Sequence, residues 1–172
     1  MITLGTTHNR TLTQWQTNLT QMRRAFPRLW VKALNDSGDI AHKYYDRQFA
    51  NQGAEFGSPW KALAARTQID RVRHGYRPSR PILVRRGWLR ASVASKSSAH
   101  AQRSVNMQGI TMWSSVPARG HNLLDIHQHG TNRIPARPIY REGTPPYISQ
   151  RGWNEIQARL TGMFVELRRM VE

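Results

Sequence analysis

The sequence contains no cysteine, which excludes disulfide bonds, thiolate nucleophiles and cysteine-ligated zinc sites. It also lacks any apolar run near the ~18 residues that indicate a membrane-spanning helix. Residues 1–10 have no apolar segment of the kind a signal peptide needs, and they read as a polar arm. We therefore expect no membrane partner and synthesis in a reducing cytoplasm.

Acidic residues are scarce, with 10 Asp and Glu against 26 Lys and Arg, for a net charge of +16. The carboxylates are scattered, and no HExxH, GxSxG or glycine-rich phosphate-loop pattern accompanies them. We predict a protein that is not an enzyme and binds no cofactor. Of the 26 basic residues 22 are arginine, whose planar guanidinium suits phosphate and carboxylate partners. Nucleic acid or acidic protein surfaces are the expected partners.

The histidines at positions 121, 127 and 129 form the most metal-like cluster. On a strand, His127 and His129 would share one face and could reach a single ion. Asp125 is the only acidic residue nearby, and two histidines do not complete a site. We predict no metal centre and expect His127 and His129 to lie at a subunit interface.

Helical periodicity marks both ends of the chain. Apolar residues at 3-4 spacing follow a helix cap at Thr11, and Pro27 is expected to kink this helix or to start a new one. A second helical stretch over 28–49 contains the poor helix formers Asn35-Asp36-Ser37-Gly38, through which continuity is favoured. A last amphipathic helix is expected after a cap at Ser149.

Short strands are predicted in the middle of the chain. The candidates are Ile82–Val84, alternating residues over 89–93, and a hairpin over 105–114 that turns at Gln108-Gly109. Residues 123–129 fit either a strand or a short helix, and a helical turn is expected after Trp60. The length of 172 residues favours one domain, 1–172. The predicted class is α+β, with N-terminal helices and a C-terminal helix packed on a small antiparallel sheet.

Residues 66–90 carry eight arginines against Asp70 alone, a net charge of +7. Pro78 and Pro81 argue against a regular element, so we predict a basic loop that is solvated, disordered, or ordered only by an acidic partner. DNA backbone and an acidic protein surface are equally acceptable partners at this point. The residues expected to make the contact are Arg71, Arg73, Arg77, Arg80, Arg85 and Arg86.

Residues 131–148 contain four prolines and are predicted to form an extended arm. Its arginines Arg133, Arg137 and Arg141 are expected to be exposed in a monomer and to become ordered on a neighbouring molecule. Deleting residues 131–143 is accordingly expected to leave a folded protein that assembles poorly.

Four short motifs in order resemble those of the phage virion morphogenesis family. Gly57–Thr67 is similar to its "PW-x-x-L-x-x-x-T", and Pro81–Ser92 to its "ILV-x-x-G-x-L-x-x-S". Ile126–Gly130 is similar to its "IHQ-x-G", and Ile134–Pro138 to its "IPARP". The family's members include tail-completion proteins of Mu-like tailed phages.

The resemblance implies a structural virion protein at the head–tail junction, which completes the tail or joins it to the head as a ring. The expected partners are further copies in a cyclic hexamer, neighbouring neck, tail-tube or connector proteins, and the packaged DNA backbone. The alternative is a non-specific DNA-binding accessory protein of phage assembly or packaging. The residues expected at subunit interfaces are Trp60, His127, His129, Arg133, Pro135, Arg137, Pro138 and Tyr140.

Overall fold

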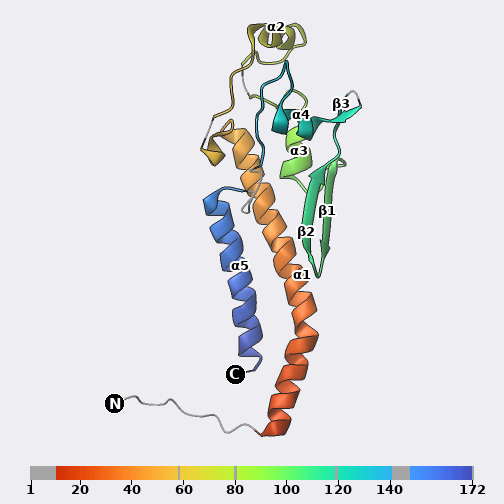
Figure 1. The fold of residues 1–172 in the computed structure, drawn as a ribbon, viewed down its shortest axis with the longest axis vertical. Helices are drawn as coiled ribbons and strands as arrows, with labels where there is room; N and C mark the ends of the chain where they lie inside the picture. The colour runs from red at the N-terminus through yellow and green to blue at the C-terminus, as the bar shows by residue number, and fades with distance from the viewer. Residues whose placement is uncertain (1–10, 58, 80, 119, 141–147, 172) are drawn as a thin grey trace, which may run out of the picture.

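The longest element of this α+β protein is its N-terminal helix. The computed structural model describes residues 11–57, 59–79, 81–118, 120–140 and 148–171. Helix α1 (Leu12–Ala50) runs most of the length of the molecule, and helix α5 (Gln150–Arg169) lies along it. A β-hairpin lies on the other side of α1 in Figure 1, and the short helices gather at the end where α1 finishes. The predicted fold class is confirmed.

Helix α1 begins with a reciprocal cap, as the sequence indicated at Thr11. The Gln14 amide donates to Thr11 Oγ1 (3.3 Å), and the Thr11 amide donates to Gln14 Oε1 (2.9 Å). The helix continues through Pro27, so no new helix starts there. Proline removes one amide donor, and packing of the next turn on α5 compensates, since Leu29 is buried.

Helices α1 and α5 bury an apolar seam between them. Leu29 and Ala33 of α1 pack with Met163 and Leu167 of α5. At the other end of α5, a Cβ on Gly152 would lie 2.8 Å from the Tyr44 ring, so glycine permits this close approach. The predicted cap is confirmed, because the Gly152 amide donates to Ser149 Oγ (3.4 Å).

The predicted hairpin is confirmed. Strand β1 (Ala101–Asn106) pairs antiparallel with strand β2 (Gly109–Ser114), and Met107-Gln108 forms the two-residue turn, one residue earlier than predicted. The Asn106 carboxamide stabilises the turn by accepting from the amides of Gln108 (2.8 Å) and Gly109 (3.1 Å). A second, smaller ladder joins β3 (Pro117–Ala118) to β4 (His121–Asn122).

The other strand predictions are wrong. Residues 88–94 form helix α3 (Trp88–Ala94), in which Leu89 and Val93 are buried one turn apart. That i, i+4 spacing fits a helix as well as the alternation fits a strand. Ile82 is buried, as a core strand would require, but lies in a turn. The open choice over 123–129 is settled as helix α4 (Leu123–His129).

A second core lies where α1 ends. Trp60 packs edge-on against Phe49 with ring centroids 5.3 Å apart. The other buried members of the cluster are Ile82, Leu89, Val93, Leu124 and Ile139. The helical turn expected at Trp60 does not form. Residues 60–64 are irregular, and helix α2 (Ala65–Arg73) begins after them. The preceding loop contains a short 3-10 helix, η1 (Ala54–Phe56).

The predicted extended arm joins this core through Ile139, and Tyr140 packs against it. The Pro138 carbonyl accepts from Gln48 Nε2 and Trp60 Nε1, both at 2.9 Å. Gln128 Oε1 accepts from the Ile139 amide (2.9 Å), and Ile139 is fully buried. The prolines fix an extended backbone whose polar groups pair with side chains of this chain itself. The expectation of exposure is wrong for Arg137, which is buried, and holds for Arg133, which is exposed. The effect of deleting residues 131–143 stays a prediction, and residues 141–147 lie outside the described part.

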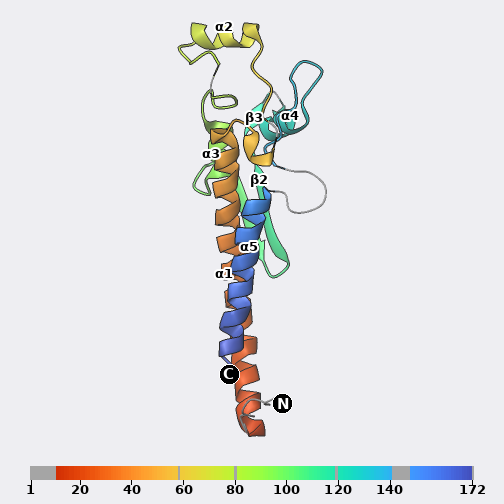
Figure 2. The same ribbon diagram turned by 90° about the vertical axis from the view of Figure 1, so that its left-hand side faces the viewer.

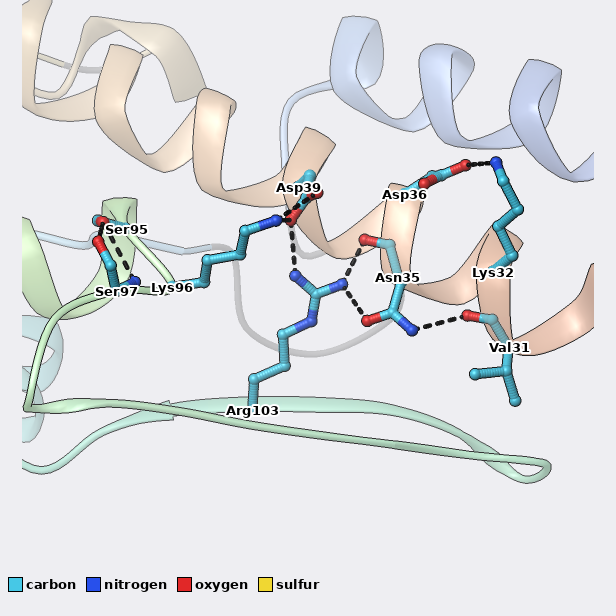
Figure 3. A network of polar contacts seen from close by, with 9 residues as sticks. All are labelled: Val31, Lys32, Asn35, Asp36, Asp39, Ser95, Lys96, Ser97 and Arg103. Atoms are coloured by element: carbon cyan, nitrogen blue, oxygen red, sulfur yellow. Dashed lines mark hydrogen bonds and ion pairs between the residues drawn. The ribbon is translucent and has the colours of Figure 1, made fainter. Parts of the chain in front are cut away.

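The hairpin is fastened to the middle of α1 by charged side chains (Figure 3). Arg103 of β1 donates to Asp39 (2.7 Å) and to the Asn35 side chain (2.9 Å), and Lys96 also pairs with Asp39 (3.0 Å). Arg159 of α5 pairs with Asp36, which also binds Lys32. We call these residues the paired-charge seam.

The four poor helix formers of α1 are thus an attachment point. A Cβ on Gly38 would lie 2.5 Å from Ile110 Cδ1, so glycine lets the hairpin pack closely on the helix. Helix α1 is continuous here, as predicted, because contacts on two sides offset the weak local preference. No helix among the described residues is long and apolar enough to cross a membrane.

Candidate anion-binding pocket

A cavity of about 760 Å³ lies at the α2 end of the molecule, the upper end in Figures 1 and 2. Its walls come from three stretches of chain, 61–71, 83–89 and 123–137. Its apolar lining includes Leu63, Leu83, Leu89, Leu123, Ile134 and Pro135. Its basic lining consists of Lys61, Arg71, Arg85, Arg86, Arg133 and Arg137, together with His127. No described carboxylate lines the cavity.

Arg71, on the last turn of α2, is the most unusual of these residues. It is only 4% exposed, and one of its nitrogens, Nη2, donates to the Pro81 carbonyl (3.0 Å). Its Nε and Nη1 atoms are buried without a hydrogen-bond partner. Burial and then the neighbouring Arg85 charge lower the pKa of Arg71, but arginine stays protonated in proteins. A buried cation with unpaired donors is costly unless an anion reaches it.

The nearest residue in sequence that could neutralise Arg71 is engaged elsewhere. Asp70 pairs with Arg85 (3.0 Å) and lies 3.4 Å from the His74 ring nitrogen Nδ1. The Arg85 guanidinium also lies 5.2 Å from the centre of the Tyr76 ring, which it faces as a cation–π pair. These contacts place Arg85 at the cavity and leave Arg71 without a carboxylate among the described residues.

Arg137 holds one wall of the cavity in place. Its Nε donates to the Lys61 carbonyl (3.1 Å) and its Nη2 to the Ala62 carbonyl (3.3 Å). Its own amide donates to the His127 carbonyl (2.6 Å). Burial lowers the pKa of Arg137. Because its guanidinium is occupied by backbone, Arg137 positions the segment beside Trp60 and contributes positive charge to the cavity.

His127 supplies a neutral polar group. Its Nδ1 is buried and has no hydrogen-bond partner. Burial first, and then the charge of Arg137, lower the pKa of His127 to about 4, so the ring is neutral at pH 7. A neutral imidazole can donate one hydrogen bond. Arg71 and His127 both line the cavity, and each has buried nitrogen atoms without a partner among the described residues.

The six arginines predicted to contact a partner do not form one surface. Arg71, Arg85 and Arg86 line the cavity, with the Arg86 guanidinium 5.3 Å from the Trp88 ring centre. Arg73 and Arg77 are exposed and do not line the cavity, and Arg80 lies outside the described residues. The predicted basic loop is wrong over its first part, because residues 65–73 form helix α2, in which Arg71 is buried.

The predicted interface residues also separate. Trp60 and Arg137 are buried within this chain, and their interface role stays a prediction. Tyr140 is half-buried, Arg133, Pro138 and His129 are exposed, and His127 and Pro135 line the cavity. Sequence reasoning missed the inward position of Arg71, which is the one buried residue of α2 and so belongs to no apolar pattern.

No family model, curated protein or solved structure matches this chain. Among the described residues, no group of three or more His, Asp or Glu could hold a metal ion.

Proposed function

We propose that this protein is a structural subunit of a phage particle, which completes the tail or joins it to the head as a ring. The observation that carries the proposal is that the four motifs behind the family resemblance meet in one place. Trp60 of the first motif and Leu89 of the second share the core at the end of α1. Gln128 Oε1 of the third motif accepts a hydrogen bond from the amide of Ile139, the residue that follows Pro138 of the fourth motif.

These contacts explain why such motifs would occur together in order. Trp60 Nε1 donates to the Pro138 carbonyl, so a side chain of the first motif holds the backbone of the fourth motif in place. Gly130, at φ +76, sits where a Cβ would lie 2.7 Å from the Ala136 amide, so the third and fourth motifs need glycine to approach each other. Each of these residues shapes the chain, which is what a structural subunit requires.

Ring formation is supported by two different exposed apolar surfaces. On α5, Phe164 is 54% exposed and Val165 lies beside it. On the hairpin, Trp113 is 47% exposed and Met107 lies at the turn. The two surfaces belong to different elements, which flank α1 in the view of Figure 1. Contact between the α5 surface of one copy and the hairpin surface of the next would be heterologous, and such contacts close into rings when the rotation permits.

The direct test is the position and copy number of the protein in particles assembled with it. We expect six copies in one ring at the head–tail junction, matching the symmetry of the tail. One or two copies per particle would overturn the proposal. At the residue level, Phe164→Lys should prevent ring assembly while the monomer stays folded, because it places a charge in an apolar contact. Gln157→Lys adds the same charge at another exposed α5 position and should assemble normally.

One observation favours the alternative, a DNA-binding accessory protein. Arg66, Arg73 and Arg77 are exposed on and after α2, at one end of the molecule. Contacts of this kind go to phosphates and carry no sequence preference. Their signature is a steep loss of duplex affinity with salt, about −0.9 in log–log slope per phosphate neutralised. Strong duplex binding at physiological salt, with no copies in mature particles, would favour the accessory role.

A further inference from the structure

We propose that the cavity at the α2 end binds an acidic segment of a partner protein, an extended peptide in which a carboxylate is flanked by apolar residues. The carboxylate would enter to Arg71, and its neighbours would contact the apolar walls. The inference rests on the cavity alone and holds whether or not the protein forms a ring.

The first step is the demand for an anion at Arg71. Its guanidinium is 4% exposed, yet Nε and Nη1 have no partner and no described carboxylate pairs with it. Leaving such donors unmade costs about 1–3 kcal/mol, and more for a charged group. A carboxylate can accept from two guanidinium nitrogens at once, the strongest neutralising contact available to arginine. Among the described residues, the Arg71 guanidinium therefore keeps donors that an anion could satisfy.

The second step is the charge around the entrance. Arg86 and Arg133 are exposed and line the cavity, and Arg85 lies beside Arg71. Because no described acidic side chain lines the cavity, its potential is positive throughout. His127 adds an unpaired ring nitrogen, which can donate to a bound carboxylate.

The third step is the lining, which selects a peptide over a bare ion. Leu63, Leu83 and Ile134 contribute apolar wall, and Trp88 contributes a half-exposed aromatic ring. A volume of about 760 Å³ is far larger than one carboxylate needs. Binding sites of this kind combine apolar walls with a few fixed polar groups, so that shape provides affinity and charge provides orientation. An acidic residue between apolar ones fits both requirements.

The fourth step separates this partner from duplex DNA. Phosphates of a duplex lie on a rigid rod, and they cannot approach a 4%-exposed guanidinium without the rest of the rod entering the cavity. A carboxylate at the end of a flexible side chain can enter the cavity that Arg71 lines. The exposed Arg73 and Arg77, which lie outside the cavity, are the residues that duplex phosphates can reach.

The test is a titration of the full chain with labelled peptides, followed by fluorescence anisotropy. The probe is acetyl-Leu-Glu-Leu-Glu-Leu, and its matched control carries Gln in place of Glu. We expect the acidic peptide to bind and the Gln peptide to bind at least about ten-fold more weakly, the loss typical of a charge-assisted contact. Poly-glutamate of the same length should also bind more weakly than the probe. Equal binding of poly-glutamate would show attraction to net charge only and would overturn the proposal.

The decisive variants remove one positive charge each. Arg71→Gln should weaken the probe about ten-fold or more, and Arg77→Gln should change its affinity less than about two-fold, because buried charged contacts dominate binding energy. Equal losses would mean general electrostatics and would overturn the proposal. If Arg71→Gln does not fold, the exposed pair Arg86→Gln and Arg133→Gln tests the same cavity. That pair should weaken the probe, and unchanged affinity would count against the proposal.

Duplex DNA is the competing outcome, and a double variant distinguishes it. Arg73→Gln with Arg77→Gln should lower duplex affinity and leave the peptide affinity unchanged. If duplex affinity falls further in Arg71→Gln than in that double variant, the cavity is a nucleic-acid site and the peptide proposal fails. Because every measurement uses the isolated chain, failure here leaves the ring proposal standing, and failure of ring assembly leaves this one standing.

Discussion

Two regions of this molecule hold buried arginines in opposite ways. In the paired-charge seam, the Arg103 side chain is 12% exposed and meets Asp39 at 2.7 Å and the Asn35 side chain at 2.9 Å. At the cavity, Arg71 is more deeply buried, at 4% exposed, and among the described residues its guanidinium donates only to the Pro81 carbonyl. Each keeps unpaired nitrogen atoms, Nε in Arg103 and both Nε and Nη1 in Arg71. The difference is that Arg103 has a carboxylate partner, Asp39, whereas Arg71 has none among the described residues.

That difference separates stability from binding. A charge-assisted contact within the chain contributes about 1.5–3 kcal/mol to folding, whereas a buried charge without a counterion costs stability. The seam therefore joins the hairpin and α5 to α1, while the cavity keeps an unsatisfied cation at a cost. Local rules are broken mainly at functional sites, which is why the cavity and not the seam is the candidate site.

The largest expected effect is at the seam. Arg103→Met should lower the free energy of unfolding by about 3 kcal/mol, because it leaves Asn35 and Asp39 without their main partner and loosens the hairpin. Urea denaturation measures the change. Lys32→Met is the matched control, since Lys32 also pairs with a carboxylate of α1 but its side chain is 59% exposed. The control should lose less than about 1 kcal/mol. Equal losses would show that the seam does not hold the hairpin.

The next effect is a pH dependence from the cavity. The pKa of His127 is about 4 in the folded protein and near 6.5 when exposed, so below pH 6.5 the unfolded chain binds a proton that the folded one does not. The contribution is fully present above pH 6.5 and is lost as the pH falls to about 4. The loss is at most about 3 kcal/mol.

His127→Gln should flatten this part of the stability profile, measured by urea denaturation between pH 7 and 4. Burial also lowers the pKa of His42, but His42 is present in both proteins, so the difference between parent and variant isolates His127. Identical profiles would mean that the His127 ring reaches solvent.

The sequence predicted what depends on local pattern. The caps at Thr11 and Ser149, the hairpin and the long helices follow from spacing and turn chemistry, and all appear in the structure. Residues 88–94 were misread because Leu89 and Val93 satisfy both periods. In the helical conformation, Ser92 Oγ lies 2.7 Å from Ser114 Oγ of the hairpin, and this tertiary hydrogen bond favours the helix.

The candidate site was predicted only in part. Arginine enrichment over 66–90 pointed to an anionic partner, and three of those arginines line the cavity. The sequence could not show that Arg71 turns inward, because its guanidinium is held by the chain that follows α2, where the Pro81 carbonyl accepts from it. The proline-rich composition of residues 131–148 predicts an exposed arm, and it does not reveal that the Pro138 carbonyl faces the side chains of Gln48 and Trp60.

A smaller effect, of opposite sign to the seam's, is expected at Arg71. Arg71→Met should raise the free energy of unfolding by about 1 kcal/mol, because a buried unpaired charge is replaced by an apolar side chain of similar length at the loss of one hydrogen bond to Pro81. Urea denaturation compares it with Arg103→Met under the same conditions. A loss as large as that of Arg103→Met would mean that Arg71 holds the fold and that the contrast between the two regions is false.

The smallest effect is expected at the exposed arginines. Arg73→Gln combined with Arg77→Gln removes two charges from a chain of +16 and should change the free energy of unfolding by less than about 0.5 kcal/mol. Both residues are exposed, so water and salt screen their charges. The small gain expected from reduced self-repulsion should vanish at about 1 M salt, where the Debye length is about 3 Å. The gain at Arg71, which is buried, should persist. If the double variant instead stabilises the protein as much as Arg71→Met does, and salt abolishes both gains, net charge and not burial explains the cost of Arg71.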